Sequence, residues 1–176
     1  MTDESLDFAS KRNFILQQGL DDPSREACPL QYSALLFQPR MVAVVLLVAI
    51  LLQSPGLFLA LGAVLWWSAL FPSLNPFDAL YNATLGSRPG RARLGPAPPP
   101  RRFAQTLAGA FSVGIAVSLL LGHHGLAYGL EAFFAAAVVA LGFGRFCFGS
   151  FVYHLLRGRL RFALETLPWS RRREGG

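Results

Sequence analysis

Apolar residues along the chain gather in four blocks that polar segments separate. The blocks cover residues 41–52, 57–71, 103–122 and 126–144, and the last two hold 19 to 20 residues each. An α-helix rises about 1.5 Å per residue, so each of these two would cross the roughly 30 Å hydrocarbon core of a bilayer. The pattern therefore predicts an all-α membrane protein with four transmembrane helices, arranged as two helical hairpins.

The first two blocks leave an alternative open. They hold 12 and 15 residues, fewer than a span normally needs, and Ser54-Pro55-Gly56 separates them. One kinked span over residues 41–71 would be long enough, but Pro-Gly is a strong turn signal. We favour two helices that extend beyond the apolar blocks.

Composition and charge support this reading. Of the 176 residues, 53% are apolar and only 15% are charged, which is not typical of a soluble domain. Fifteen of the 16 basic residues precede the first block, separate the second from the third, or follow the fourth. The positive-inside rule then predicts that both termini are cytoplasmic. This placement also explains the net charge of +6, so we expect no nucleic-acid partner.

Composition divides the chain into five segments. They are an N-terminal segment with an interfacial helix (1–38), a first hairpin that ends in a short interfacial helix (39–85), a Pro/Arg/Gly-rich linker (86–102), a second hairpin (103–157) and a basic tail (158–176). The N-terminal segment lacks the apolar run of a signal peptide, so we expect it to be retained. In the short helix, Asn75 suits the N-cap, Pro76 the first position and Asp78 the positive end of the helix dipole. Arginines of the linker and tail are expected to contact anionic lipid headgroups.

Small residues recur every four positions on the last two predicted helices. They are Ala104, Ala108, Ser112 and Ala116 on one helix, and Ala132, Ala136, Ala140 and Gly144 on the other. In lipid, such stripes allow helix backbones to approach closely. We therefore predict that these two helices pack stripe to stripe.

The stretch GFGRFCFGSF, residues 142–151, carries the candidate chemistry. If the last helix continues through it, Cys147, Ser150 and His154 extend the arc of small residues. A thiol, a hydroxyl and an imidazole on one face are the groups that a thiol-dependent reaction uses. Cys147 and His154 are therefore candidate catalytic residues.

Two charged residues fall within the predicted spans, Glu131 and Arg145. They are 14 residues apart, about 21 Å along a helix, which is too far for a direct ion pair. We expect Arg145 to reach the headgroups or to meet an acid such as Asp78. An ionisable group at membrane depth is also a candidate functional site.

The chain has two cysteines, Cys28 and Cys147. They are too few for a disulfide framework and lack zinc-site spacing, so we predict no metal and no cofactor. Cys28 is a candidate resolving thiol if the N-terminal segment brings it close to Cys147. Two ordinary reduced thiols are the alternative.

Four stretches resemble one family of bacterial membrane proteins. They are NFILQQG (13–19), WWSALFPSLNPFDALYN (66–82), PPRRFAQ (99–105) and FCFGSFVYHLLRG (146–158). The resemblance is to domain of unknown function 4395, and over residues 31–158 it implies a four-helix integral membrane protein without assigned activity. Members often carry Cys-x-Gly-Cys where this chain has Cys147-Phe148-Gly149-Ser150. Ser150 thus stands where a redox pair would have its second thiol.

Three functions remain open. The leading hypothesis is an accessory or scaffold protein that binds partner membrane proteins, or copies of itself, through its small-residue stripes. The second is a thiol-dependent redox or sulfur-handling protein centred on Cys147. The third is a small transporter that acts as an oligomer, because one chain offers few polar groups within its spans. The charge map and the resemblance together predict a multi-pass protein of the bacterial inner membrane.

Overall fold

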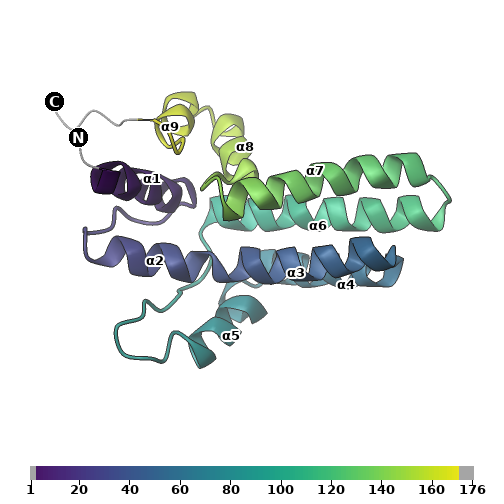
Figure 1. The fold of residues 1–176 in the computed structure, drawn as a ribbon, viewed down its shortest axis with the longest axis horizontal. Coiled ribbons are helices and arrows are strands. Elements are labelled where there is room, and N and C mark those ends of the chain that lie inside the picture. The colour runs from purple at the N-terminus through teal and green to yellow at the C-terminus, as the bar shows by residue number, and fades with distance from the viewer. Residues whose placement is uncertain (1–2, 171–176) are drawn as a thin grey trace.

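The computed structural model describes residues 3–170, and the regular elements in that range are all helical (Figure 1). Four helices form a bundle: α3 (Phe37–Leu52), α4 (Pro55–Leu70), α6 (Pro99–Leu120) and α7 (His124–Gly142). The others gather at one end, which we call the base: α1 (Asp3–Gln17), α2 (Ala27–Leu35), α5 (Pro76–Thr84), α8 (Phe148–Leu156) and α9 (Leu160–Glu165). A single 3₁₀ turn, η1 (Pro72–Leu74), links α4 to α5 within this range. The predicted all-helical class is confirmed, as is a helix in the N-terminal segment.

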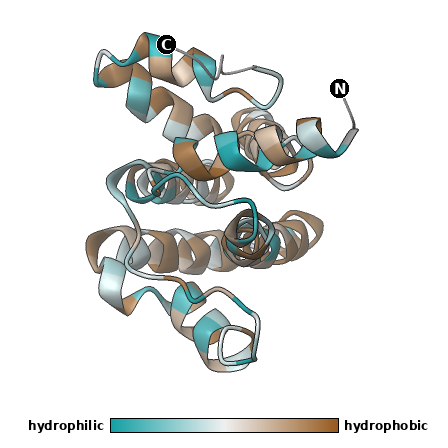
Figure 2. Ribbon diagram, turned by 90° about the vertical axis from the view of Figure 1, so that its left-hand side faces the viewer, coloured by the Kyte–Doolittle hydropathy of each residue, from teal (hydrophilic) through white to brown (hydrophobic). Residues whose placement is uncertain are grey.

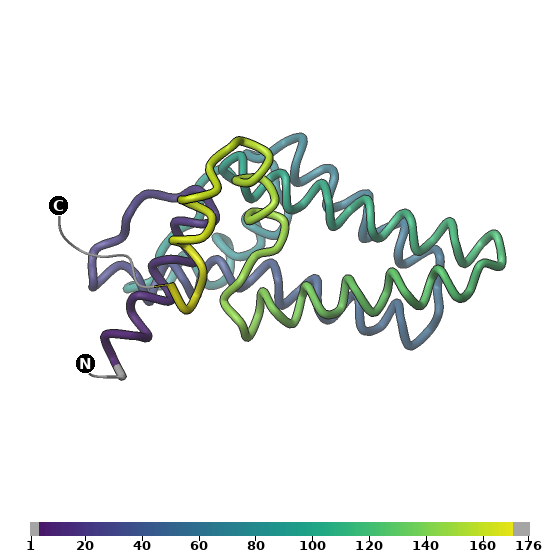
Figure 3. The backbone as a smooth tube through the Cα atoms, turned by 90° about the horizontal axis from the view of Figure 1, so that it is seen from above, coloured from purple at the N-terminus to yellow at the C-terminus, as the bar shows by residue number. Residues whose placement is uncertain are grey.

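The chain reverses between α3 and α4, so the alternative of one kinked span is wrong. Gln53 closes α3 in a left-handed conformation with a φ of 44°. The hydroxyl of Ser54 then accepts a hydrogen bond from the amide of Leu57 at 3.4 Å, and Pro55 takes the first position of α4. Figure 3 shows the two hairpins side by side, with their turns at the end away from the base.

The four bundle helices pack in a closed ring. Helix α3 contacts α4 and α7, and α6 also contacts α4 and α7. The core inside the ring consists of Val42, Leu46, Ala49, Phe58, Leu61, Leu65, Ile115, Ala116 and Phe134. Because each of the four helices contributes to this core, the two hairpins form one packed unit.

The backbones of α4 and α6 approach each other closely at a pair of glycines, Gly62 and Gly109. A Cβ atom placed on Gly109 would lie 2.5 Å from Cδ1 of Trp66, and one on Gly62 would lie 2.9 Å from Cγ2 of Val113. Each added Cβ would also lie 3.2 Å from the backbone oxygen of the other glycine. The indole nitrogen of Trp66 donates to the carbonyl of Thr106 at 3.1 Å, which fixes the ring across α6. Small residues thus allow two helices to pack closely, but the pair is α4 and α6, whereas the prediction was α6 and α7.

The predicted stripe-to-stripe packing of α6 on α7 is wrong. On α7 and just beyond it, Ala132, Ala136 and Gly144 are exposed and Ala140 is half-buried. The buried positions of α7 are Ala127, Glu131 and Phe134. The physical reason is that the ring of Phe134 fills the core and the carboxylate of Glu131 is kept off the apolar outer surface of the bundle. The small residues on the other side of α7 therefore face outward.

The α6 stripe divides between two other neighbours. Ser112 is fully buried, and its Cβ lies 3.4 Å from a Cβ built on Gly62 of α4. At the base, a Cβ on Gly149 of α8 would lie 2.6 Å from Cα of Ala104. Ala108 packs on the bundle core and Ala116 belongs to it.

Three helical stretches are long and apolar enough to cross a membrane. They are Ala27–Leu52, in which α2 runs into α3, then Pro99–Leu120 and His124–Gly142. Helix α4 is apolar but has 16 residues. At about 1.5 Å per residue it falls short of the roughly 30 Å hydrocarbon core. Four spans were predicted, and length and composition support three.

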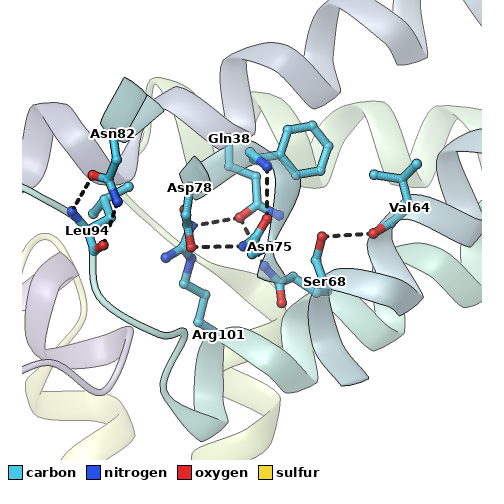
Figure 4. A network of polar contacts seen from close by, with 10 residues as sticks. Gln38, Val64, Ser68, Asn75, Asp78, Asn82, Leu94 and Arg101 are labelled. Atoms are coloured by element: carbon cyan, nitrogen blue, oxygen red, sulfur yellow. Dashed lines mark hydrogen bonds and ion pairs between the residues drawn. The ribbon is translucent and has the colours of Figure 1, made fainter. Parts of the chain in front are cut away.

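The segment between α5 and α6 is fastened to the base. The side chain of Asn82 donates to the carbonyl of Leu94 at 2.8 Å and accepts from its amide at 2.9 Å (Figure 4). Helix α6 begins at Pro99, so Arg101 and Arg102, which were predicted to lie in the linker, are helical. Figure 2 looks onto this end, where hydrophilic stretches (teal) lie among hydrophobic ones (brown).

Candidate functional site

The chain breaks its helix between α7 and α8, which changes the expected geometry around Cys147. Helix α7 ends at Gly142, and Arg145 is left-handed with a φ of 54°. The amide of Phe146 returns to the carbonyl of Ala140 at 3.1 Å, and Cys147 is extended at the N-cap of α8. One helical wheel through residues 132–154 is therefore wrong, because α7 ends at Gly142 and the chain turns at Arg145. The turn also needs a small residue at Gly144, where a Cβ would lie 2.7 Å from the carbonyl oxygen of Ala140.

The three candidate residues nevertheless share a buried environment. Cys147, Ser150 and His154 are 4%, 0% and 2% exposed. Ser150 and His154 are four apart on α8 and so lie on one face. The hydroxyl of Ser150 donates to the carbonyl of Pro100 at 3.4 Å, which fastens α8 to the start of α6.

Gln17, which sequence reasoning did not single out, joins Cys147 to His154. Its side-chain oxygen accepts from the amide of Cys147 at 2.9 Å, and its backbone oxygen lies 3.1 Å from Nε2 of His154. A carbonyl oxygen only accepts, so Nε2 of His154 carries a proton that it donates to this oxygen. The other ring nitrogen, Nδ1, is buried without a partner. Both candidates thus bind the end of α1, and His154 is held by a backbone carbonyl.

Arg145 pairs with a different acid from the one predicted. Its Nη2 lies 2.6 Å from Oδ1 of Asp7, on α1, and its guanidinium carbon lies 5.5 Å from the ring centroid of Tyr32. Asp78 is unavailable to it because Arg101 occupies that carboxylate. The first helix therefore neutralises the arginine at the α7–α8 break.

A buried polar network lies where the bundle meets the base (Figure 4). Nη2 of Arg101 lies 2.5 Å from Oδ1 of Asp78 and donates to Oε1 of Gln38 at 2.8 Å. Asn75 donates to the other oxygen of Asp78 at 2.9 Å and accepts from the amide of Phe77 at 3.0 Å. The predicted N-cap at Asn75 is confirmed. Asp78 does more than favour the helix dipole, because it neutralises a buried arginine.

The direction of each hydrogen bond in this network follows from Arg101. A guanidinium only donates, so the Gln38 atom that it meets is the amide oxygen. That oxygen also lies 3.0 Å from the side-chain nitrogen of Gln105, so Gln105 is the donor in this contact. Its own oxygen, Oε1, is buried and has no hydrogen-bond partner. The network therefore leaves one acceptor unsatisfied.

A cavity of about 110 Å³ lies beside this network, lined mainly by the bundle and the start of α8 and open on one side. Four polar side chains, Gln18, Gln38, Arg101 and Gln105, line one part of it. Most of the remaining wall is apolar and includes Val42, Leu65, Ala108, Phe111, Phe134 and Val138. Cys147 also lines it. The arrangement is that of an amphipathic binding site.

Glu131 lies away from this cavity, near the turn of the first hairpin. It is 5% exposed, and the side-chain nitrogen of Gln53 donates to its two carboxylate oxygens at 3.2 and 3.1 Å. Arg145 pairs with Asp7, as described above, so the expectation that Glu131 and Arg145 do not pair is confirmed. Glu131 is a buried carboxylate with an amide partner.

Cys28 packs inside the base, in a cluster with Phe14, Ile15, Leu35 and Leu36. Its thiol and that of Cys147 are both free and buried. In residues 3–170, no group of three or more His, Cys, Asp and Glu side chains could hold a metal ion.

We expect Asp78→Ala to destabilise the protein by about 3–5 kcal/mol, because it leaves the Arg101 guanidinium buried without a counter-charge. Asp78 and Arg101 side chains are only 8% and 7% exposed. The free energy of unfolding in detergent measures the effect. The matched control is Arg161→Ala, which removes an ion pair to Glu165 from an arginine that is 93% exposed and should change stability little. Equal effects of the two variants would refute the importance of the buried pair.

We expect the protein to lose stability as the pH falls from 7.5 to 5.5. Burial lowers the pKa of His154 from its ordinary value of 6.5, partly opposed by the hydrogen bond to Gln17. A lowered folded-state pKa means that this stability is complete above 6.5 and is lost below it, by at most about 1.4 kcal/mol per pH unit. Asp7, whose pKa is lowered mainly by its hydrogen bond from Lys11, titrates below this window. Thermal unfolding of His154→Gln should depend less on pH over this range, and an unchanged slope would exclude His154 as the cause.

Comparison with known proteins identifies the family of this chain. No curated protein and no solved structure matches the chain significantly. The profile of the family described as domain of unknown function (DUF4395) matches residues 33–158, which include the whole bundle, the polar network and α8. The chain therefore belongs to the DUF4395 family.

Proposed function

We propose that this protein is a multi-pass protein of the bacterial inner membrane, with the base and both termini on the cytoplasmic side. The observation that carries this is the division between an apolar bundle and a charged base. From Val42 to Leu70 the chain has no charged residue, and from Phe103 to Gly144 it has only Glu131. The outward bundle surface carries large apolar side chains such as Leu47, Leu51, Leu120, Leu121 and Val139, which are 56–73% exposed.

Helix α4 is too short to cross the membrane unless the apolar segment continues beyond its end. The helix has 16 residues, but Phe71 and the 3₁₀ turn Pro72–Leu74 follow it directly, and Phe71 and Leu74 are exposed apolar side chains. This extension lengthens the apolar path, and modest thinning of the bilayer would account for the rest. Arg88, Arg91 and Arg93, exposed at the base, would then lie near anionic headgroups.

Within the membrane we propose an accessory role, in which α7 binds a helix of a partner protein or of a second copy. Gly129, Ala132 and Ala136 are exposed and lie at helical spacing on the outer face of α7. In lipid, small outward residues favour a close helix neighbour over acyl chains. Of the large apolar residues of α7, Phe134 is buried in the bundle core.

The geometry supports a thiol-dependent reaction less well than the accessory role. Cys147 and His154 are both held by Gln17, and the imidazole directs its proton to a backbone carbonyl. Ser150 is committed to Pro100. A catalytic use of Cys147 would need these contacts to rearrange.

Cysteine labelling tests the orientation. We expect His123→Cys, at the exposed α6–α7 turn, to react with a membrane-impermeant maleimide in intact bacterial cells. Ser87→Cys, exposed at the base, should react only after permeabilisation. The natural Cys28 and Cys147 are buried, so background labelling should be low. The reverse pattern, or equal labelling of both sites in intact cells, contradicts the proposed topology.

Association is tested by the size of the particle extracted in mild detergent. We expect the wild type to migrate as a complex larger than one chain, and Ala136→Leu to reduce that complex at least severalfold, because the added side chain separates the helices. The matched control is Ala110→Leu, the same change at an exposed alanine of α6. A wild-type protein that is monomeric and free of partners would remove the basis for an accessory role.

A further inference from the structure

We propose that the cavity beside Arg101 binds a neutral amphiphile: a molecule with an apolar chain or ring and one hydroxyl group that donates to Gln105. Binding of such a ligand in the cavity is a property separate from the accessory role proposed above. Only the ligand's route of entry rests on the membrane insertion proposed above.

The need for a hydrogen-bond donor follows from the polar network. Arg101 donates a hydrogen bond to the side-chain oxygen of Gln38, so that oxygen faces Arg101. The same oxygen accepts a second hydrogen bond from the side-chain nitrogen of Gln105. Gln105 is 4% exposed and lines the cavity, and its Oε1 has no partner. A buried acceptor without a donor is unfavourable, so a ligand that supplies one is favoured over a ligand that does not.

The charges in the network select against an ionic headgroup. Of the cavity-lining residues within 3–170, Arg101 is the one with a charged side chain, and Asp78 already neutralises it at 2.5 Å. An anion would have to displace this carboxylate, and a cation would meet the guanidinium. A neutral hydroxyl group requires neither change.

The apolar part of the wall suits a hydrocarbon chain or an aromatic ring. Phe111 stacks on Phe133 with ring centroids 5.1 Å apart, and Phe133 meets Phe148 edge to face at 5.5 Å. A site of about 110 Å³ is smaller than the cavity of about 150 Å³ that accepts benzene in another protein. The cavity therefore takes the hydroxyl end and the first carbons, and the rest of the ligand must leave it.

An exit lies at the surface of the bundle. Phe133 and Phe148 line the cavity and are themselves 44% and 36% exposed, so its wall reaches the outside between α7 and the start of α8. Helix α7 ends at Gly142, close to this opening. In the proposed orientation the opening faces the cytoplasmic leaflet, from which an amphiphile would enter sideways.

The test uses the purified full-length protein in detergent and a long-chain alcohol with a photoreactive diazirine close to its hydroxyl end. We expect crosslinks in α6 and α7 at the cavity wall. An excess of unlabelled alcohol should abolish them, whereas its methyl ether, which lacks the donor, should compete about three- to tenfold less well. Gln105→Leu should remove this difference between alcohol and ether.

The cavity itself is tested by filling it. We expect Ala108→Phe, in the wall, to reduce crosslinking at least fivefold, and Ala110→Phe, exposed on the same helix, to leave it unchanged. Equal competition by alcohol and ether in the wild type would overturn the proposed hydroxyl recognition. Crosslinks confined to the outer faces of the bundle would overturn the site. Because the assay is done in detergent, these outcomes are independent of the labelling experiment on topology.

Discussion

The ion pair between Arg101 and Asp78 constrains the whole junction between bundle and base. Arg101 is 6% exposed, and a buried guanidinium is stable only if its charge and its donors are matched. The matching groups come from two other helices. Asp78 is supplied by α5, Gln38 by α3, and Arg101 itself by the first turn of α6. The short helix after the first hairpin must therefore fold back against the start of the second. The position of α5, the fastening of the linker and the polar wall of the cavity all follow from that requirement.

A second, uncharged junction ties the N-terminal helix to the far end of the chain. Gln17 is fully buried and binds both the amide of Cys147 and the ring of His154, about 130 residues away in the sequence. Asp7 of the same helix neutralises Arg145 at the break between α7 and α8. Residues 3–17 thus help to hold the break in place, although they lie outside the region that matches the family. At the first junction, beside the cavity, the side-chain oxygen of Gln105 is buried without a partner.

How far the sequence predicts this site depends on the range of each interaction. Asn75 and Pro76 correctly predicted the start of α5, because helix capping involves residues only two or three apart. Cys147, Ser150 and His154 are all buried, but the wheel that grouped them assumed an unbroken helix. Gln17, Gln38 and Gln105 were missed. A signal existed for the last two, since each is a polar residue at the start of an apolar run, close to an arginine.

By itself, the sequence determined that the chain is helical, where the hairpins turn, and which end carries the charge. These properties depend on apolar blocks, on Pro-Gly and Asn-Pro signals, and on arginine positions, all of which act locally. The tertiary structure decided which acid meets which arginine, which face of α7 turns inward, and where a cavity remains. Those outcomes depend on contacts between residues as far apart as Asp7 and Arg145, and on how large and small side chains fill a shared core. A periodicity of 3.6 residues shows which residues share a face, but the packing of the other helices determines what that face contacts.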